Sequence, residues 1–160
     1  MTSKAEAALA IFKSYEGEEE GVGEWFQIDQ ARINLFADAT MDHQFIHIDP
    51  VKSAQLSPYK VTIAHGFLTL SLIVHLGSSI APKKPAALDG IYMGVNYGLD
   101  KVRFPAPVPV DSFIRARHTL MSAELKNPNT IQVKRQVTIE LQGGDKPVCI
   151  AESLTRLMYG

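Results

Sequence analysis

Asp42 and His47 are the two residues of this 160-residue chain whose types and spacing suit catalysis. A carboxylate and an imidazole that converge on one water molecule can remove and return a proton, because histidine titrates near neutral pH. They lie in segment 40–50, which has no regular hydrophobic period and is predicted as a loop, a common place for reactive groups. Spacing alone leaves a structural role open, in which Asp42 caps a helix and His47 packs beside Phe45.

Gly66 is a second candidate, at the start of an apolar segment. The first amides of a helix lack internal acceptors and lie at its positive dipole end, so they can stabilise a developing oxyanion. Glycine has no Cβ and would let a ligand approach the backbone closely. Close packing of the helix against a sheet explains the same residue, and both interpretations remain open.

Segment 63–80 is predicted as a long buried helix, because it is apolar on nearly every side and its only charge-capable residues are His65 and His75. A helix without a polar face is a buried helix. Gly66 and Gly77 interrupt the segment, which favours burial in a sheet over a membrane span.

The second half of the chain predicts antiparallel strands. From Ile131 to Leu141 apolar and polar residues alternate, except that Arg135 falls on the apolar side. Segments 90–104, 112–125 and 148–158 are long enough for neighbouring strands. The first part predicts a helix over 5–15, a solvated turn at 18–20, a strand over 24–28 and a helix capped by Asp29. This order predicts a single α+β domain over residues 1–160.

Composition excludes several classes of protein. With 46% apolar and 21% charged residues, the chain fits an ordinary globular domain. A net charge of −1 argues against a general nucleic-acid binder. The single cysteine, Cys149, excludes an intrachain disulfide, and no segment suits a signal peptide or a membrane span. We therefore expect a cytoplasmic protein that binds neither nucleic acid nor membrane.

The segment Ala37–Pro50, followed by Ile63–Leu68, resembles the MaoC-like dehydratase family, which includes the (R)-specific enoyl-CoA hydratases. The branch related to nodulation protein N is closer, and that likeness extends through Tyr97–Val108. The resemblance implies a hotdog fold, in which an antiparallel sheet wraps around the long central helix. It also implies a homodimer with the site near the subunit boundary.

The resemblance further implies reversible addition of water to a trans-2-enoyl-CoA. Asp42 and His47 would hold and deprotonate the water, and the Gly66 amide would polarise the thioester carbonyl. We expect Gln44, Phe45 and His65 to bind the acyl-CoA substrate, with no metal and no organic cofactor. The loop departs from the family's usual Gly-Asp-x-Asn-Pro-x-His, because Met41, Gln44 and Phe45 replace Gly, Asn and Pro.

Other interpretations stay open. The same fold could hydrolyse thioesters, or bind acyl-CoA without catalysis. A metal set could comprise Asp42 with three histidines, His43, His47 and His65, although their spacing is no usual zinc signature. Coenzyme A phosphates could contact any of several basic residues: Lys60, Lys83, Lys84, Lys101 and Arg103. Packing or surface positions are expected for His75 and His118, and a buried position for Cys149.

Overall fold

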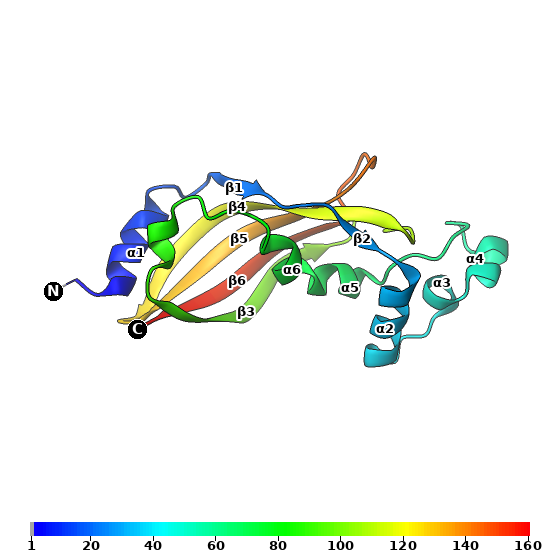
Figure 1. Cartoon of the computed structure of the whole chain (residues 1–160), viewed down its shortest axis with the longest axis horizontal. Helices are drawn as coiled ribbons and strands as arrows, with labels where there is room; N and C mark the ends of the chain where they lie inside the picture. The colour runs from blue at the N-terminus through cyan, green and yellow to red at the C-terminus, as the bar shows by residue number, and fades with distance from the viewer. Residues whose placement is uncertain (1) are drawn as a thin grey trace.

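A six-stranded antiparallel sheet forms the centre of the computed structural model, which describes residues 2–160 (Figure 1). The strand order is β1-β4-β5-β6-β3, and β2 pairs with β4 beside β1. The strands are β1 (Glu19–Val22), β2 (Phe26–Ile28), β3 (Ile91–Arg103), β4 (Ser112–Asn127), β5 (Thr130–Leu141) and β6 (Cys149–Tyr159). The four strands predicted in the second half of the chain are confirmed to within two residues at each end, as is the α+β class.

The alternation along β5 explains why this strand lies in the middle of the sheet. Ile131, Val133, Val137 and Ile139 are fully buried or nearly so, and they contribute to two apolar clusters on the inner face. Arg135 lies between the two clusters on that same face. Its guanidinium forms an ion pair with Glu20 of β1, which satisfies the charge where the apolar pattern is interrupted.

The predicted turn at residues 18–20 is therefore wrong. Residues 19–22 form the edge strand β1, which pairs with β4, and Glu20 lies over the inner face as the partner of Arg135. A preceding helix, α1 (Lys4–Lys13), begins at a capping box formed by Ser3 and Glu6. It packs against the end of the sheet where β4 turns into β5, together with the short 3-10 helix η1 (Pro85–Leu88).

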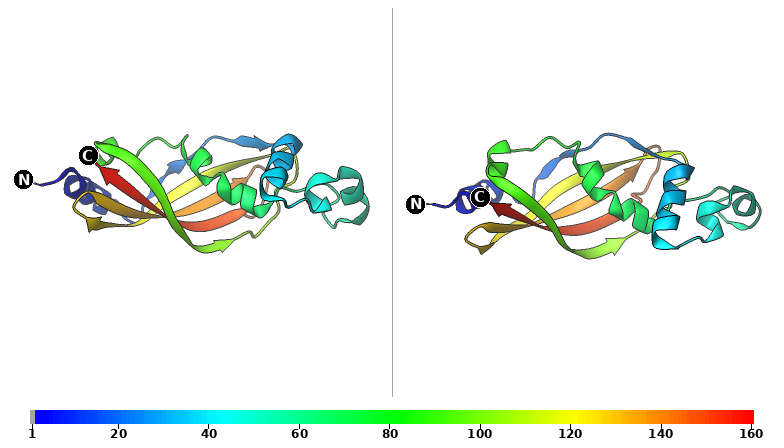
Figure 2. Two further views of the ribbon diagram at one scale, coloured as in Figure 1. Left: turned by 90° about the horizontal axis from the view of Figure 1, so that it is seen from below. Right: turned by 60° about the horizontal axis from the view of Figure 1, so that its bottom comes forward.

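The long helix predicted over 63–80 is two short helices, α5 (Gly66–Ser71) and α6 (Ile73–Gly77). They lie across the concave face of the sheet, in the hotdog arrangement that was expected (Figure 2). Residues 63 and 64 are extended because they pair with the segment at 108–109. At Leu72 the backbone turns more tightly, and its N–H bonds to the carbonyls of residues 68–70.

Burial of this helical segment is one-sided. Leu68 and Leu76 face the sheet and are buried, whereas Phe67 is 68% and Val74 61% exposed in the single chain. The absence of a polar face correctly predicted contact with the sheet, but it did not predict an uncovered apolar side.

A cluster of three helices extends beyond the end of the sheet that lies farthest from α1 (Figure 1). Asp29 caps α2 (Gln30–Thr40), as predicted, by accepting the Arg32 N–H. The predicted loop over 40–50 is confirmed only in part. Residues 41–44 are irregular and carry Asp42, whereas α3 (Phe45–Ile48) and the start of α4 (Pro50–Leu56) are helical. Asp49 accepts the Lys52 N–H and Pro50 occupies the first turn, so this boundary follows ordinary capping rules.

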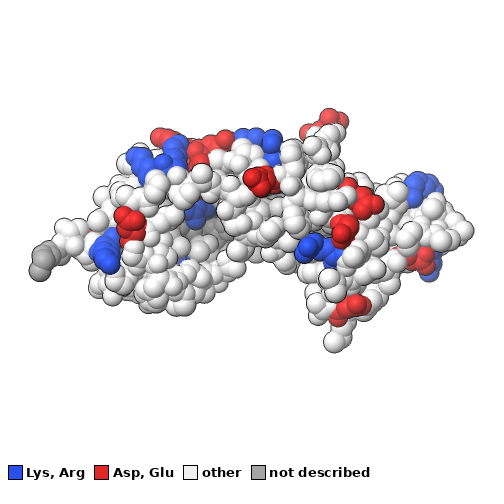
Figure 3. Space-filling model, viewed as in Figure 1, with Lys and Arg blue, Asp and Glu red and all other residues white. Residues whose placement is uncertain are grey.

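Within residues 2–160, no helix combines the length and the apolar character that crossing a bilayer requires. Acidic and basic side chains are intermixed on the face of the molecule seen in Figure 3.

Candidate active site

His47 lies on the short helix α3 and is almost completely buried. Its Nδ1 lies 2.7 Å from the carbonyl oxygen of Ile63. A carbonyl can only accept, so Nδ1 carries the proton of the neutral ring and Nε2 keeps a lone pair. Burial lowers the pKa of His47, although the hydrogen bond to Ile63 and the charge of Asp42 oppose the shift. The result is a neutral imidazole suited to act as a base.

Asp42 lies just before α3, after the left-handed Met41 that ends α2. Its side chain is about half exposed, and one carboxylate oxygen is 3.4 Å from the backbone nitrogen of Gln44. His65 fixes the backbone of Asp42, because its Nε2 donates to the Asp42 carbonyl oxygen over 2.9 Å. The carboxylate therefore faces solvent while its backbone is fixed.

The two histidine rings stack, with centroids 3.8 Å apart and an interplanar angle of 23°. Phe36 packs against the His65 ring, so His65 is enclosed between an aromatic ring and the His47 imidazole. One oxygen of Asp42 and one nitrogen each of His47 and His65 all lie within 4.8 Å of one another. The fold thus brings Asp42 and His47 close enough to share a water molecule.

Gly66 opens α5 beside His47, and both residues line one pocket of about 280 Å³. Within residues 2–160, no protein acceptor pairs with the Gly66 N–H, as expected at the first position of a helix. A Cβ at this position would lie 3.1 Å from the ring of Phe104. Glycine therefore allows the ring of Phe104 to pack closely over this position, where a Cβ would force the ring to shift by a few tenths of an ångström.

The remainder of the pocket wall is mainly apolar. The residues that line it, besides His47 and Gly66, are Tyr59, Ile63, Ala64, Thr69, Phe104, Pro105, Ala106, Pro107, Val108 and Val148. Such a wall suits a hydrocarbon chain next to a reactive polar group.

The predicted substrate-binding residues have different positions. Gln44 is exposed at the start of α3, and the ring of Phe45 packs beneath the Lys52 ammonium at 4.9 Å. His65 is buried behind His47. None of the three lines the pocket, so in the single chain they border or support the site and do not form its wall.

Sequence reasoning missed Gln30 and Thr62, two polar residues that lie behind His47. The Gln30 amide donates to the His47 carbonyl and accepts the Thr62 hydroxyl. It also missed Phe104, whose ring covers Gly66. The aromatic residue before Pro105 was a possible signal, but only the three-dimensional structure shows which segment it faces.

The remaining candidate residues divide between the site and distant parts of the molecule. His43 pairs with Asp38 at 2.8 Å, so it does not join the three converging residues in the alternative metal set.

Burial raises the pKa of Cys149 to about 11, which fits a buried, unreactive thiol. Burial, aided by Arg135, lowers the pKa of His118 to about 4. His75 is exposed and packs edge-on against Phe26.

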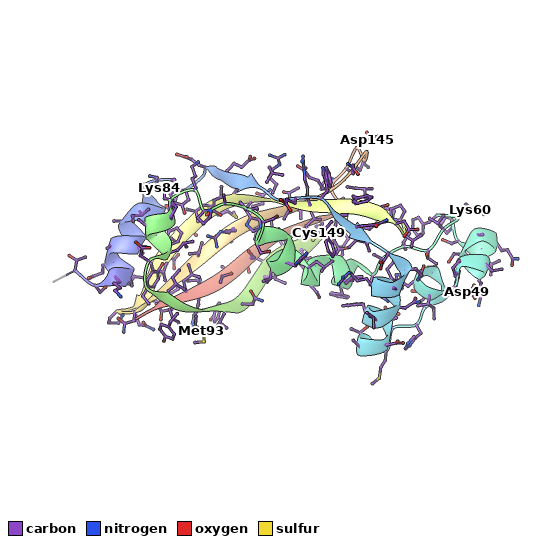
Figure 4. The ribbon with its side chains drawn as sticks, viewed as in Figure 1. Asp49, Lys60, Lys84, Met93, Asp145 and Cys149 are labelled. Carbon is purple, nitrogen blue, oxygen red and sulfur yellow. The ribbon has the colours of Figure 1, made fainter. Side chains whose placement is uncertain are left out.

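The candidate basic residues for coenzyme A are widely separated. Lys60 lies near α4, whereas Lys84 lies at the opposite end of the molecule beside α1 (Figure 4). Lys83 pairs with Glu18, also at that distant end, and Lys101 is largely exposed on β3. Arg103 donates to the neighbouring Val102 carbonyl. Within one chain, the group cannot form a single phosphate-binding site.

Comparison with known proteins gives consistent results. Residues 12–142 match the family described as "MaoC like domain". The chain is 46% identical over 149 residues to the 3-hydroxyacyl-thioester dehydratase Z of Mycobacterium tuberculosis, covering 93% of this chain and 95% of that one. It is 42% identical over 154 residues to nodulation protein N of Rhizobium leguminosarum bv. viciae, covering 96% and 93%. R-hydratase PhaJ1 from Pseudomonas aeruginosa shares the fold with a TM-score of 0.68 and 21% identity, over 93% of this chain and 86% of that one.

Proposed function

The chain belongs to the family of MaoC-like domains, and from that premise we propose that it is a hydro-lyase that adds water reversibly to trans-2-enoyl-CoA. The product is the (R)-3-hydroxyacyl-CoA. The observation that carries this proposal is the convergence of Asp42 and His47, together with a mainly apolar pocket that both His47 and Gly66 line.

The proposed reaction assigns a role to each group. His47 and Asp42 hold a water molecule and remove one of its protons while the water oxygen bonds to the β-carbon. Electrons of the carbon–carbon double bond move to the α-carbon and the thioester oxygen, where the Gly66 N–H stabilises the negative charge. The α-carbon then receives the proton, so the elements of one water molecule are added overall. Dehydration runs through the same steps in reverse.

The hydrogen bond to Ile63 supports His47 as the base. It holds the proton on Nδ1 and leaves Nε2 free to accept one. The lowered pKa of His47 keeps the ring neutral at pH 7. A base and an oxyanion donor together suffice for this reaction, so we propose that no metal or organic cofactor takes part. Hydration is then expected to persist after dialysis against EDTA.

We also propose that two copies pair through β3. This strand is bonded on one side to β6, and no strand within residues 2–160 pairs with its other edge. Apolar side chains along it are exposed, among them Tyr92, Met93, Val95, Tyr97 and Leu99, and Figure 4 shows Met93 on the outer side of the sheet. Free strand edges with exposed apolar residues favour pairing with another strand. Because Phe104 follows β3 and lines the pocket, such pairing would bring the partner close to the site.

Incubation with crotonyl-CoA tests the function directly. We expect loss of the enoyl absorbance and formation of (R)-3-hydroxybutyryl-CoA without release of free thiol. Free coenzyme A without a hydroxyacyl product would indicate thioester hydrolysis instead. Binding of crotonyl-CoA without turnover would indicate an acyl-CoA-binding module.

A further inference from the structure

Gln30 forms three hydrogen bonds at the back of the candidate site. Its Nε2 donates to the His47 carbonyl over 2.7 Å and to Asn34 Oδ1 over 2.9 Å. Its Oε1 accepts the Thr62 hydroxyl over 2.6 Å. One side chain on the first turn of α2 thus connects α3 to the segment that precedes α5.

The orientation of the Gln30 amide follows from these partners. The His47 carbonyl can only accept, so the group facing it must be the NH₂ and not the oxygen. The oxygen is then directed to Thr62, which is 1% exposed and has a hydroxyl to donate. A side chain that lacks either the donor or the acceptor would leave a partly buried polar group unpaired.

Gln30 controls both ends of the interaction that orients the imidazole. It holds the backbone of His47, from which the ring projects. Through Thr62 it also holds the residue immediately before Ile63, whose carbonyl accepts the His47 Nδ1–H. A backbone bond from the Ile63 N–H to the Ile46 carbonyl joins the same two segments. The Gln30 amide and this backbone bond together fix the ring relative to its acceptor.

The two segments that Gln30 connects are themselves held in place by the rest of the fold. α2 begins at the Asp29 cap and is held to the core by Ile33, which is fully buried. On the other side, the Val110 N–H donates to the Thr62 carbonyl and the Ala64 N–H to the Val108 carbonyl. Gln30 thus spans two rigid segments and does not depend on a mobile partner.

We propose that Gln30, acting with Thr62, is a positioning residue that holds His47 in its Nδ1–H form with Nε2 directed to the reacting water. The proposal rests on the proposed function of His47 as a base. Displacing a catalytic group by about 1 Å can cost on the order of 100-fold in rate. Gln30 itself would touch neither water nor substrate.

Three substitutions test this proposal, with one matched control. Gln30→Met keeps the length of the side chain and removes all three hydrogen bonds. Thr62→Val replaces the hydroxyl by a methyl group, whereas Thr62→Ser keeps the hydroxyl. The control is Gln27→Met, which makes the same exchange at an exposed glutamine of β2 whose amide contacts the Asp111 carbonyl, away from His47.

We expect kcat for crotonyl-CoA hydration to fall about 10- to 100-fold in Gln30→Met and about tenfold in Thr62→Val, with KM changed less than threefold. Thr62→Ser and Gln27→Met should stay within twofold of the wild type. Imidazole ¹⁵N NMR should show a protonated Nδ1 for His47 in the wild type and an increased Nε2–H population in Gln30→Met.

The NMR readout separates this inference from the proposed function, because it requires no turnover. An unchanged His47 tautomer together with less than a twofold loss of kcat in Gln30→Met would overturn the inference. So would an equal loss in Gln27→Met. If the wild type lacks hydratase activity but the tautomer still shifts in Gln30→Met, the positioning role stands and the proposed reaction fails. Should Gln30→Met not fold, the comparison of Thr62→Val with Thr62→Ser decides by the same criteria.

Discussion

The Nδ1 of His47 donates to the carbonyl oxygen of Ile63 over 2.7 Å, and this bond determines what the imidazole can do. It connects the helix that follows Asp42 to the segment that leads into Gly66. It is one of three hydrogen bonds that join the two separated sequence motifs, beside those from the Ile63 N–H to the Ile46 carbonyl and from His65 Nε2 to the Asp42 carbonyl. It leaves the second nitrogen of the ring available for proton transfer.

Substitution of either Asp42 or His47 should greatly lower the rate of hydration. We expect His47→Ala and Asp42→Asn each to lower kcat by about 10²- to 10⁴-fold, the usual contribution of a positioned acid or base. Asp42→Asn keeps the size of the side chain, and the His65 bond is made to the Asp42 backbone, so the fold should persist. Stopped assays with crotonyl-CoA measure the loss, and His43→Ala serves as a control because His43 pairs with Asp38 outside the pocket. Full activity in either variant would exclude the proposed roles.

Close packing at the pocket predicts a compensating pair of substitutions. Gly66→Ala should lower kcat about tenfold, because the new methyl group would lie 3.1 Å from the Phe104 ring and force that ring to shift at the pocket wall. Phe104→Leu should partly restore the rate in the Gly66→Ala background by making space. Steady-state kinetics of the two single variants and the double variant form the test. Strictly additive losses would show that the two positions do not interact.

His118 should make the fold sensitive to mild acid. Burial lowers its pKa from 6.5 to about 4, so the unfolded chain binds a proton at a pH where the folded chain does not. The stability present above pH 6.5 is therefore lost as the pH falls toward 4, by about 2 kcal/mol between pH 7.5 and 5. Urea unfolding at the two pH values measures this loss.

The comparison variant for this effect is His118→Gln, which should show a smaller loss of stability between the same two pH values. His75→Gln replaces an exposed histidine and should leave the loss unchanged. An identical pH dependence in wild type and His118→Gln would contradict the assignment.

The free edge of β3 predicts a dimer that charge can disrupt. A double substitution, Val95→Lys with Leu99→Lys, places two ammonium groups on exposed positions of this strand. We expect light scattering after gel filtration to report about twice the mass of the 17.6 kDa chain for the wild type and a single chain for the variant. The control Leu125→Lys, at an exposed position of β4 away from that edge, should leave the mass of the wild-type assembly unchanged. A monomeric wild type would argue against pairing through β3.

Local sequence patterns predicted the sheet well. The alternation from Ile131 to Leu141 and the Asp29 cap both act through neighbouring residues, so a single sequence displays them. The role of Glu20 was missed because its partner Arg135 is 115 positions away, a separation that no local pattern reports. The helix over 63–80 was predicted too long, since the pairing of residues 63 and 64 with the distant segment 108–109 leaves no local pattern in the sequence.

In the candidate site too, some residues were predicted from the sequence, whereas others became evident only from contacts between distant segments. The resemblance to a family brought Asp42, His47 and Gly66 into consideration. In the structure His47 and Gly66 line one pocket, and a carboxylate oxygen of Asp42 lies within 4.8 Å of a ring nitrogen of His47. Gln30 and Thr62 were missed because glutamine and threonine are common surface residues. Only their contact with the His47 carbonyl and with each other indicates a role.

The stereochemistry of the hydration product is the decisive measurement for the proposed reaction. Purified protein is incubated with crotonyl-CoA, and the 3-hydroxybutyryl product is resolved by chiral chromatography, with Asp42→Asn as the blank. We expect the (R) enantiomer, formed by the wild type at least about 100-fold faster than by Asp42→Asn. An (S) product, a racemate, or equal product from Asp42→Asn would contradict it.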